Sequence, residues 1–508
     1  MMASARIPDH LLLPSAYDHP VEAVRLIETH MSWVFLTGPY AYKVKKPVNF
    51  GFVNFATLDR RHHFCVEELR CNRQFAAALY RAVLPIVVGA QGRLRIGAPD
   101  EGAAAVDWAV QMVQFDPTQQ ADVLLAGGHL RSDDLHRFGS ELAVQHSSLV
   151  PFAGDYDPIT PVADNFASLL RGALQPTLRQ RVERLAEATA GESSRYAARL
   201  LRRQDAGRVR ECHGDLHLTN MVRLADGLCA FDCLEFDQAL RCIDVYCDAA
   251  FLLMDCLVRD RPDLAYAFLD GYLNAAGDYD GLSLVPYFAR YRSLVRAKVA
   301  ALRLAQVPGE RAASDKLERH LGWAAAHSQR PAGDLLIMNG VSGTGKSFWA
   351  EQLVPALGAM RLRSDVLRKA EFAAADTTAR HLRAGLYEAS VSEQVYVRLA
   401  ELSEALLRAG ETVIVDAACL QRSSRALLQR AAEKAGAKVR ILRLTAPDAV
   451  LAARIEARQR TGNDASDADV EVLRWQQADE QPPVAPQESV VTVDTGNLNL
   501  TRLLAAHR

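Results

Sequence analysis

The sequence predicts a mixed α/β protein with two domains. The first, residues 1–330, is expected to be bilobal, and the second, residues 333–508, is expected to carry a parallel sheet. Strand and hairpin signals surround one helical segment in residues 33–116, and a mostly helical stretch follows. Beyond residue 333 strands alternate with helices, which is typical of a parallel sheet covered by helices.

The smaller lobe of the first domain is expected to end near residue 112. A hinge at 110–115 leads into the larger lobe, residues 113–330, where one hairpin at 220–232 interrupts the helices. The turn dipeptide Gly38-Pro39 separates the first two strands. The elements expected in the smaller lobe are strands at 33–36, 41–45, 83–88, 92–96 and 106–115 and a helix at 57–79.

The second domain is expected to follow a linker at residues 327–334. This segment is polar and contains Pro331 and Gly333. A helix is expected from Lys346. The expected strands are 335–339, 360–363, 412–415 and 439–444.

The composition of the 508 residues is that of an ordinary globular chain, with 49% hydrophobic residues and a net charge of −2. Such a balance gives no global field that would favour nucleic acid or an anionic membrane. No apolar run approaches the roughly 20 residues of a membrane helix. The first residues lack the order of a signal peptide, and the nine cysteines show no paired CxxC spacing. We therefore expect a cytoplasmic protein with reduced thiols and no membrane partner.

Residues 340–347, GVSGTGKS, match the phosphate-binding pattern G-x-x-x-x-G-K-[ST]. The motif follows an apolar strand and opens a helix, so its backbone N–H groups can face phosphates at a helix N-terminus. Lys346 is expected to contact the β- and γ-phosphates and to assist transfer, and Ser347 to ligate Mg²⁺. The expected nucleotide-binding residues are Gly340, Ser342, Gly343, Thr344, Gly345, Lys346 and Ser347.

Further residues of this domain are candidates for the same site. Asp416 ends an apolar strand and would act on Mg²⁺ or its water, with a helix cap or loop role as the alternative. Asp365 follows the preceding strand, where ligands bind in open α/β folds. It would be catalytic unless it caps a helix beginning at Val366. Arg454 and Arg458 share a helix face and would close over phosphates, with a solvated face as the alternative.

A second motif, HGDLHLTN at residues 213–220, has the order H-x-D-x-x-x-x-N, as protein kinases have in H-R-D-x-x-x-x-N. The hairpin that follows places Asp232 at the end of an apolar strand. Phosphoryl transfer needs a base for the acceptor hydroxyl and oxygen ligands for Mg²⁺. His213 and Asp215 are therefore assigned to catalysis, with Asp215 as the base, and Asn220 and Asp232 are assigned to the metal.

Acidic residues also follow the metal aspartate. They are Glu235, Asp237, Asp244, Asp248 and Asp255. Asp244 and Asp248 share a helix face and could attract a cationic acceptor. We expect Asp244 instead to orient the catalytic loop or to cap a helix.

The strand sequence YAYKVKK at residues 40–46 offers a lysine for the α- and β-phosphates. Alternation puts Lys43 and Lys45 on one face, and Lys43 is preferred because it ends the more apolar half. The helix at 57–79 offers Glu67 or Glu68 as its ion-pair partner, with Glu68 preferred. A solvated run of charges is the alternative.

These motifs resemble two known groups. Residues 333–508 resemble the P-loop small kinases, which include gluconate and shikimate kinases, zeta toxins and polynucleotide 5′-kinases. That resemblance implies that Asp365 addresses the acceptor hydroxyl. Residues 30–330 resemble the aminoglycoside phosphotransferase and choline/fructosamine kinase-like families, in which HGD replaces HRD.

As a whole, the chain resembles bacterial proteins with fused aminoglycoside-phosphotransferase-like and ATP-binding kinase domains. It departs from the kinase pattern before Lys43, where only Gly38 in a tight turn replaces G-x-G-x-x-G.

The sequence thus predicts a bifunctional phosphotransferase in which each domain uses ATP and Mg²⁺ to phosphorylate a hydroxyl of a small molecule. In one alternative, one domain is a catalytic kinase and the other is a nucleotide-sensing regulator. In another, the P-loop domain acts on nucleic-acid ends, which would need a basic groove that the near-neutral composition does not support. The motifs specify neither the acceptors, nor ATP over GTP, nor the oligomeric state.

Overall fold

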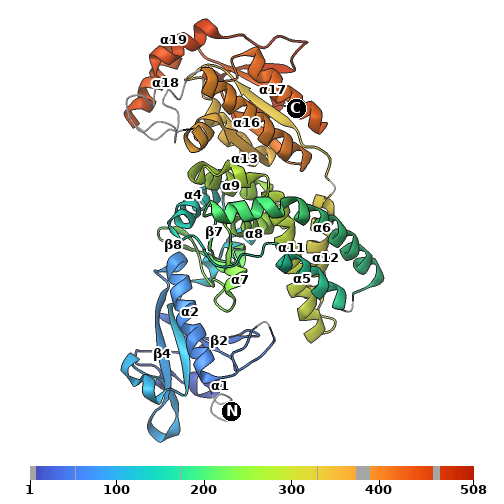
Figure 1. Cartoon of the computed structure of the whole chain (residues 1–508). Coiled ribbons are helices and arrows are strands. Elements are labelled where there is room, and N and C mark those ends of the chain that lie inside the picture. The colour runs from blue at the N-terminus through green and yellow to red at the C-terminus, as the bar shows by residue number, and fades with distance from the viewer. Residues whose placement is uncertain are drawn as a thin grey trace. The chain divides into compact units, whose positions relative to one another are not determined.

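The computed structural model describes residues 7–51, 53–172, 174–328, 330–372, 389–461 and 469–507. Figure 1 labels helices and strands along the chain, which forms two compact units. The first contains residues 1–130, 148–158 and 198–248, and the second contains residues 131–147, 159–197 and 249–508. The mixed α/β class is confirmed, whereas the domain boundary at 330–333 stays a prediction.

A six-stranded antiparallel sheet, in the order β1-β2-β3-β6-β4-β5, forms the first part of the first unit. Helix α2 (Leu58–Ala76) packs on β4 and β6, and the hydroxyl of Thr57 caps it by accepting the N–H of Arg60. The expected strands and helix are confirmed. Strand β1 was not predicted, because its side chains are mostly exposed and show no alternation. The strands are β1 (Arg25–Glu28), β2 (Ser32–Leu36), β3 (Tyr40–Lys45), β4 (Tyr80–Val88), β5 (Leu94–Ile96) and β6 (Asp107–Val113).

Two short strand pairs complete the first unit. The predicted hairpin is confirmed as β8 (Met221–Leu224) and β9 (Gly227–Ala230). The pair of β7 (Val209–Glu211) with β10 (Cys242–Asp244) was not predicted, because three-residue strands carry too little pattern. The remaining helices here are α1 (Ile7–Leu11), α3 (Ala121–Ala126), α7 (Gln238–Arg241) and the start of α8 (Val245–Val258).

The second unit contains a helical part and a parallel sheet in the order β12-β13-β11-β14-β15. The helical part comprises α4 (Ser132–Ser148), α5 (Thr160–Arg171), much of α6 (Pro176–Asp205), α9 (Pro262–Ala276), α10 (Tyr279–Leu282), α11 (Val285–Gln306) and α12 (Arg311–Ser328). The strands are β11 (Leu335–Asn339), β12 (Ala359–Arg363), β13 (Thr412–Asp416), β14 (Val439–Thr445) and β15 (Val490–Asp494).

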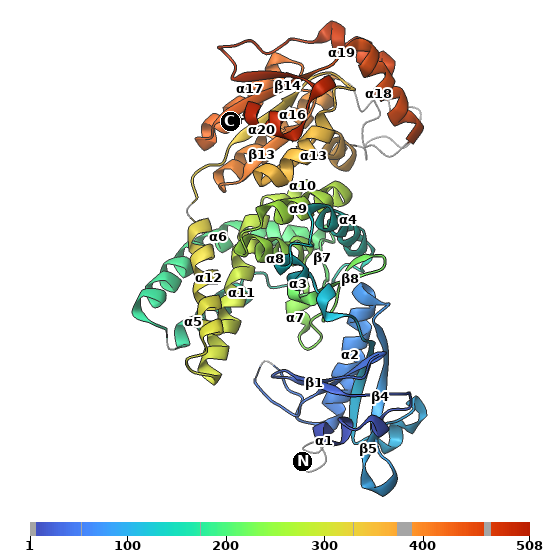
Figure 2. The ribbon, with the colours of Figure 1, turned by 180° about the vertical axis from the view of Figure 1, so that it is seen from behind.

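Helices lie on both sides of this sheet (Figure 2). They are α13 (Lys346–Leu357), α14 (Ser364–Leu367), α16 (Ala389–Arg408), α17 (Arg422–Ala435), α18 (Asp448–Thr461), α19 (Val470–Asp479) and α20 (Leu500–His507). Helix α9 also packs on α13 and β12, so the helical part and the sheet share one unit. The predicted parallel sheet is confirmed, and of its described strands only the half-buried edge strand β15 was not predicted.

All nine cysteines are free thiols, and all of them except the partly exposed Cys229 are buried. Seven lie in the first unit, and Cys256 and Cys419 lie in the second. None of the described helices combines the length and the apolarity that crossing a membrane requires.

Candidate active sites

In the first unit, β3 and α2 bring two lysines onto one buried carboxylate. Lys43 Nζ lies 2.7 Å from Glu68 Oε1, and Lys45 Nζ lies 2.6 Å from Glu68 Oε2. Burial disfavours the charged form of Glu68, but the two ammonium groups outweigh it and lower the pKa of this carboxyl. Glu68 therefore faces the strand lysines, whereas Glu67 pairs with Arg70.

Lys43 also donates a hydrogen bond of 2.6 Å to Asp232 Oδ1, just after β9. Burial opposes its charge, but Asp232 and Glu68 raise the pKa of Lys43 well above its usual value. Asp232 has a φ of 61°, a left-handed conformation that costs on the order of 1 kcal/mol in a residue other than glycine. Its N–H donates to the hydroxyl of Tyr80 at 3.2 Å, which helps to hold it there.

Asp215 and Asn220 meet in the loop between β7 and β8. The Asn220 amide nitrogen donates to the carbonyl and to the Oδ2 of Asp215, at 3.1 Å each. This leaves the amide oxygen of Asn220 as the atom that a metal would use. The Asp215 side chain is 32% exposed, so an acceptor can reach its carboxylate.

His213 is fully buried, and both of its ring nitrogens bind backbone atoms. Nε2 donates to the carbonyl of Phe231 at 3.0 Å, and Nδ1 accepts the N–H of Asp215 at 3.4 Å. Burial lowers the pKa of His213, which favours the neutral ring that these two bonds need. His213 thus ties the Asp215 loop to the segment that carries Asp232.

Asp248 orients the same loop through its backbone. Its carboxylate accepts the N–H of His213 at 3.2 Å and the N–H of Gly214 at 2.9 Å. Gly214 has a φ of 81°, and a Cβ there would lie 3.1 Å from the carbonyl oxygen of Leu240. Asp244 instead accepts the N–H of Tyr246 at 2.9 Å and so caps α8. The expected helix cap is thus found at Asp244, whereas the contact to the loop backbone comes from Asp248.

Glu235 belongs to the same charge cluster, and sequence reasoning noted it only as one of several acidic residues that follow Asp232. It accepts from Lys45 Nζ, and both side chains are buried. Burial raises the pKa of Glu235, and Lys45 opposes that shift. No local motif marks this pair, because its members lie 190 residues apart in the sequence.

In the second unit, the glycine-rich segment joins β11 to α13. Gly340, Gly343 and Gly345 have φ values of 144°, 84° and 86°. A Cβ on Gly343 would lie 2.8 Å from the carbonyl oxygen of Leu451. Lys346 Nζ donates to the carbonyl of Val341 at 2.9 Å. This turn depends on glycine for its backbone conformation and for its close packing.

Two side chains from outside the motif contact this turn. Gln476 Oε1, on α19, accepts the N–H of Ser342 at 2.7 Å and was not predicted. Arg454, on α18, donates to the carbonyl of Gly343 at 3.2 Å and to Thr495 Oγ1 at 2.9 Å. The structure thus places Arg454 beside the glycine-rich turn. The side chain of Arg458 lies outside the described part of the chain.

Ser347 and Asp416 lie together at the carboxyl end of the sheet. Ser347 Oγ donates to Asp416 Oδ1 at 3.1 Å. Asp416 Oδ2 is buried and accepts no hydrogen bond from the described residues, although Arg361 Nη1 lies 3.6 Å away and Arg363 Nε 3.7 Å away. A buried carboxylate oxygen beside a serine hydroxyl suits Mg²⁺, which prefers oxygen ligands.

Asp365 lies in the first turn of α14, directly after β12. The helix begins at Ser364 with Arg363 as its N-cap residue, so the predicted helix start at Val366 is wrong and Asp365 does not cap this helix. Burial raises the pKa of Asp365, and Arg368, 3.8 Å away, opposes the shift. Asp416 raises the pKa of Asp365 further, which is consistent with their place at neighbouring strand ends.

Comparisons with known proteins match both parts of the chain. The model of a phosphotransferase enzyme family matches residues 60–285, and the model of an AAA domain matches residues 335–483. Uncharacterized protein Rv2004c of Mycobacterium tuberculosis is 30% identical over 475 residues, which are 91% of each chain. Uncharacterized protein Mb2027c of Mycobacterium bovis shows the same identity and coverage.

Two solved structures are similar over part of the chain. A choline/ethanolamine kinase family protein from Mesorhizobium loti is 14% identical, covers 64% of this chain and 99% of its own, and has a TM-score of 0.38. A gluconokinase from Sinorhizobium meliloti is 22% identical, covers 35% of this chain and 90% of its own, and has a TM-score of 0.26. With the mycobacterial matches spanning nearly all of both chains, this protein belongs to their family and carries a phosphotransferase-family domain followed by a P-loop, kinase-like domain.

Proposed function

We propose that this protein is a bifunctional phosphotransferase that transfers the γ-phosphate of ATP to hydroxyl groups of small molecules. The observation that carries the proposal is the presence of one set of nucleotide-handling groups in each unit. Lys43, Asp215 and Asp232 lie in the first unit, and Lys346 and Asp416 lie in the second.

In the first site, Lys43 would hold the α- and β-phosphates while Glu68 keeps its ammonium group in place. Asn220 and Asp232 would hold Mg²⁺, which neutralises phosphate charge when bound. Asp215 would accept the proton of the acceptor hydroxyl as that oxygen bonds to the γ-phosphorus and ADP leaves. His213 would act as a positioning residue for this loop.

In the second site, the glycine-rich turn and Lys346 would bind the β- and γ-phosphates. Ser347 and Asp416 would hold Mg²⁺. Asp365 would take the proton of the acceptor, and its raised pKa suits it to act as a base. Arg454 would neutralise charge that develops during transfer.

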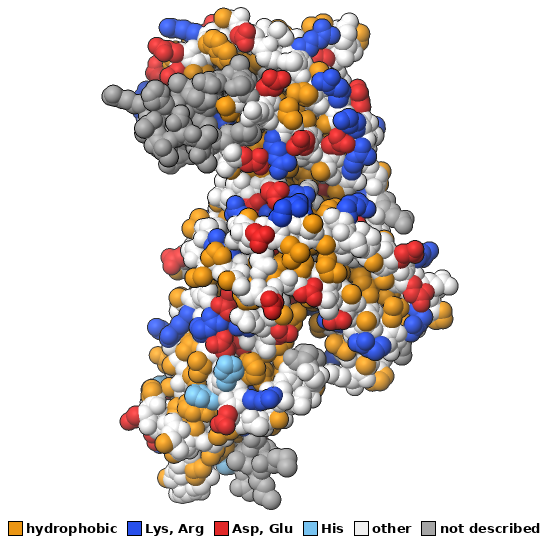
Figure 3. Space-filling model, in the orientation of Figure 1, with side chains coloured by type: hydrophobic (Ala, Val, Ile, Leu, Met, Phe, Trp, Pro, Cys, Tyr) orange, Lys and Arg blue, Asp and Glu red, His pale blue; other side chains and the backbone are white. Residues whose placement is uncertain are grey.

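Two alternatives predict different behaviour. A nucleotide-sensing unit would bind ATP without turning it over. A domain that acts on nucleic-acid ends would need a basic groove, but on the face shown in Figure 3 Lys and Arg side chains are interspersed with Asp and Glu. The mixed charges on this face give no support to the nucleic-acid alternative.

Titration with a non-hydrolysable ATP analogue and Mg²⁺ should show two sites per chain. Lys346→Ala should remove one of them, and Asp232→Asn should weaken the Mg²⁺-dependent binding of the other. A single site that persists after Lys346→Ala would contradict the P-loop assignment.

Incubation with ATP, Mg²⁺ and a metabolite mixture, read by mass, should reveal phosphorylated products. Products lost in Asp215→Asn belong to the first site, and products lost in Asp365→Asn belong to the second. With acceptor present, the double variant Asp215→Asn/Asp365→Asn should turn over more slowly than Asp215→Asn alone. Equal turnover of the two would contradict the role of Asp365.

A further inference from the structure

A buried ion pair in the second unit joins helix α9 to the P-loop site. Arg361 on β12 and Asp270 on α9 are 0% and 2% exposed. The guanidinium binds the carboxylate through two hydrogen bonds, from Nε to Oδ1 at 2.8 Å and from Nη2 to Oδ2 at 2.7 Å. Such a bidentate ion pair fixes the orientation of the guanidinium group as well as its position.

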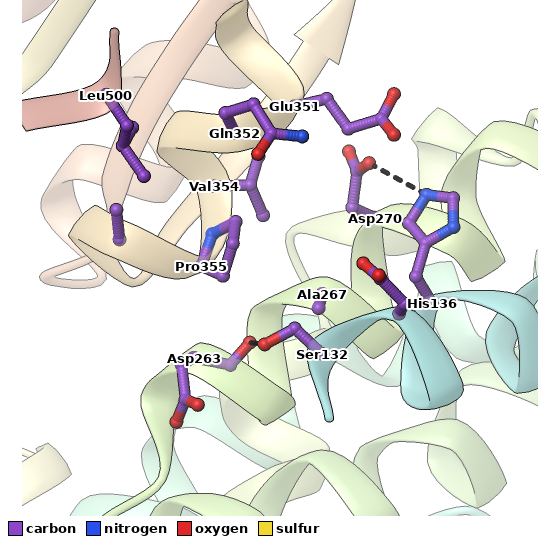
Figure 4. A pocket seen from close by; sticks show the side chains of 12 residues that line it. Ser132, His136, Asp263, Ala267, Asp270, Glu351, Gln352, Val354, Pro355 and Leu500 are labelled. Carbon is purple, nitrogen blue, oxygen red and sulfur yellow. Dashed lines mark hydrogen bonds and ion pairs between the residues drawn. The ribbon is translucent and has the colours of Figure 1, made fainter. Parts of the chain in front are cut away.

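Asp270 is itself held from a second helix. His136 on α4 lies with its Nε2 3.3 Å from Asp270 Oδ2. Figure 4 shows these two side chains facing each other, with Glu351 of α13 beside them. They line a cavity of about 530 Å³. The carboxylate that binds Arg361 thus also lies beside the His136 ring.

The third guanidinium nitrogen points to the proposed metal site. Arg361 Nη1 donates to the carbonyl of Ser347 at 3.0 Å and lies 3.6 Å from Asp416 Oδ2. Ser347 and Asp416 are the two residues proposed to hold Mg²⁺. One arginine thus contacts the backbone of one ligand residue and approaches the carboxylate of the other.

Arg361 and Mg²⁺ would compete for the same carboxylate oxygen. A guanidinium free to move would approach Asp416 to about 2.8 Å, the usual length of a charge-assisted hydrogen bond. The two bonds to Asp270 commit Nε and Nη2 and keep Nη1 beyond that distance. The Oδ2 atom of Asp416 then stays available to a metal.

We propose that Asp270 is a positioning residue of the P-loop site. It restrains Arg361, which keeps Asp416 available to Mg²⁺ and fixes the carbonyl of Ser347. This inference rests on the nucleotide site proposed for the second unit. Asp270 lies within the residues that match the phosphotransferase family, so a residue of that match serves the P-loop site.

The test is an Mg²⁺ titration of ATP-analogue binding in the full chain, with Asp232→Asn as the background to weaken the first site. Asp270→Asn keeps the shape of the side chain and removes its charge. We expect it to weaken the apparent Mg²⁺ affinity about 10- to 100-fold, as loss of a residue that orients a metal ligand does. Analogue binding in EDTA, which depends on the glycine-rich turn and Lys346, should change little.

The matched control is Tyr266→Phe, one turn earlier on α9. It removes a hydroxyl that bonds to Glu411, so it should lower the melting temperature and leave the Mg²⁺ affinity at the wild-type value. Wild-type Mg²⁺ affinity in Asp270→Asn would overturn the inference. An equal loss of Mg²⁺ affinity in Tyr266→Phe would also overturn the inference, because that result would show that any weakening of the packing of α9 has this effect.

If Asp270→Asn does not fold, Arg361→Lys replaces it. Lysine keeps the charge but cannot bridge Asp270 and Ser347 at once. The same loss of Mg²⁺ affinity is expected, and a wild-type value would overturn the inference. Failure of the proposed function would look different, because analogue binding would then be insensitive to Lys346→Ala in the same background.

Discussion

The first site is assembled from side chains that neutralise one another, whereas the second is assembled around a backbone turn. In the first unit, Glu68 bridges Lys43 and Lys45, and Lys43 also holds Asp232. In the second, three glycines with positive φ shape residues 340–345. The first site should therefore be sensitive to the loss of single charges, and the second to the gain of a single methyl group.

The largest expected effect separates chemistry from binding in the first site. Asp215→Asn should reduce the turnover of this site about 10²- to 10⁴-fold, because it removes the general base. Nucleotide affinity should stay close to wild type, because Lys43, Glu68 and Asp232 are unchanged. Steady-state turnover and analogue binding measure the two quantities.

The control for this variant is Asp226→Asn, in the exposed turn between β8 and β9. It makes the same chemical change in an exposed turn of the hairpin that follows the catalytic loop, and it should leave turnover unchanged. Full turnover in Asp215→Asn would remove that residue from the catalytic role.

Gly343→Ala tests whether the second site depends on the backbone conformation of its glycine-rich turn. Gly343 and Gly436 both have positive φ, so alanine at either should cost about 1 kcal/mol of stability. Only at Gly343 does the new Cβ meet backbone, 2.8 Å from the carbonyl oxygen of Leu451. This overpacking should add about 1–3 kcal/mol and weaken analogue binding at the second site about tenfold or more.

Denaturant unfolding and analogue titration of the two alanine variants provide the comparison. Equal stability losses, with binding retained in both, would show that the turn tolerates the added methyl group. The second site would then not depend on glycine as described.

The contrast also explains what the sequence could predict. The central residues of both candidate sites lie in contiguous motifs, so Lys346, Ser347, Asp215 and Asn220 could be singled out as candidates from spacing alone. Asp416 and Asp232 could be found because the first ends an apolar strand and the second lies just after one. These signals are local, so they can be recognised in the sequence without knowing how the chain packs.

The partners that orient these residues carry no such signal. Arg361 and Asp270 lie 91 residues apart, and each is an ordinary charged residue in its own segment. Gln476 reaches the glycine-rich turn from 134 residues away. The edge strand β1 was missed for a related reason, since its mostly exposed side chains show no alternation. The edge strand β15 was missed as well, and its side chains are half-buried or exposed.

A smaller effect is expected from the charge cluster of the first unit. Glu235→Gln removes one of the two buried carboxylates that pair with Lys45. The other, Glu68, remains. We expect a loss of about 1.5–3 kcal/mol in the free energy of unfolding, the usual contribution of a hydrogen bond to a charged group. Urea unfolding followed by tryptophan fluorescence would measure it.

Glu101→Gln is the matched control, because its pair with Arg95 is 35% and 40% exposed. Solvent screens such exposed pairs, so Glu101→Gln should change the free energy of unfolding far less than Glu235→Gln does. Similar losses in the two variants would mean that the buried cluster adds nothing beyond an ordinary surface pair.

The smallest expected effect is a pH dependence in the second unit. The Asp270 carboxylate, 3.3 Å from His136 Nε2, raises the pKa of His136 above its usual value, and burial opposes the shift. Because the folded-state pKa is raised, the protonated His136 ring stabilises the fold. This contribution to the free energy of unfolding is fully present below about pH 6.5 and is lost as the pH rises through the folded-state pKa. Glu351 adds to the shift and Arg361 reduces it.

Thermal unfolding of wild type and His136→Gln across this pH range would detect the effect. The wild type should lose part of its stability as the pH rises, and the variant should lose less. Parallel curves for the two proteins would contradict the contribution of His136.

The distribution of thiols offers a way to follow each unit separately. Seven of the nine cysteines lie in the first unit and two in the second, and only Cys229 is partly exposed. An alkylating reagent should therefore label Cys229 first and reach the others only as the surrounding structure opens. Peptide mapping after timed alkylation would then report which unit opens first, without any engineered label. The cysteines thus serve as built-in reporters of local unfolding.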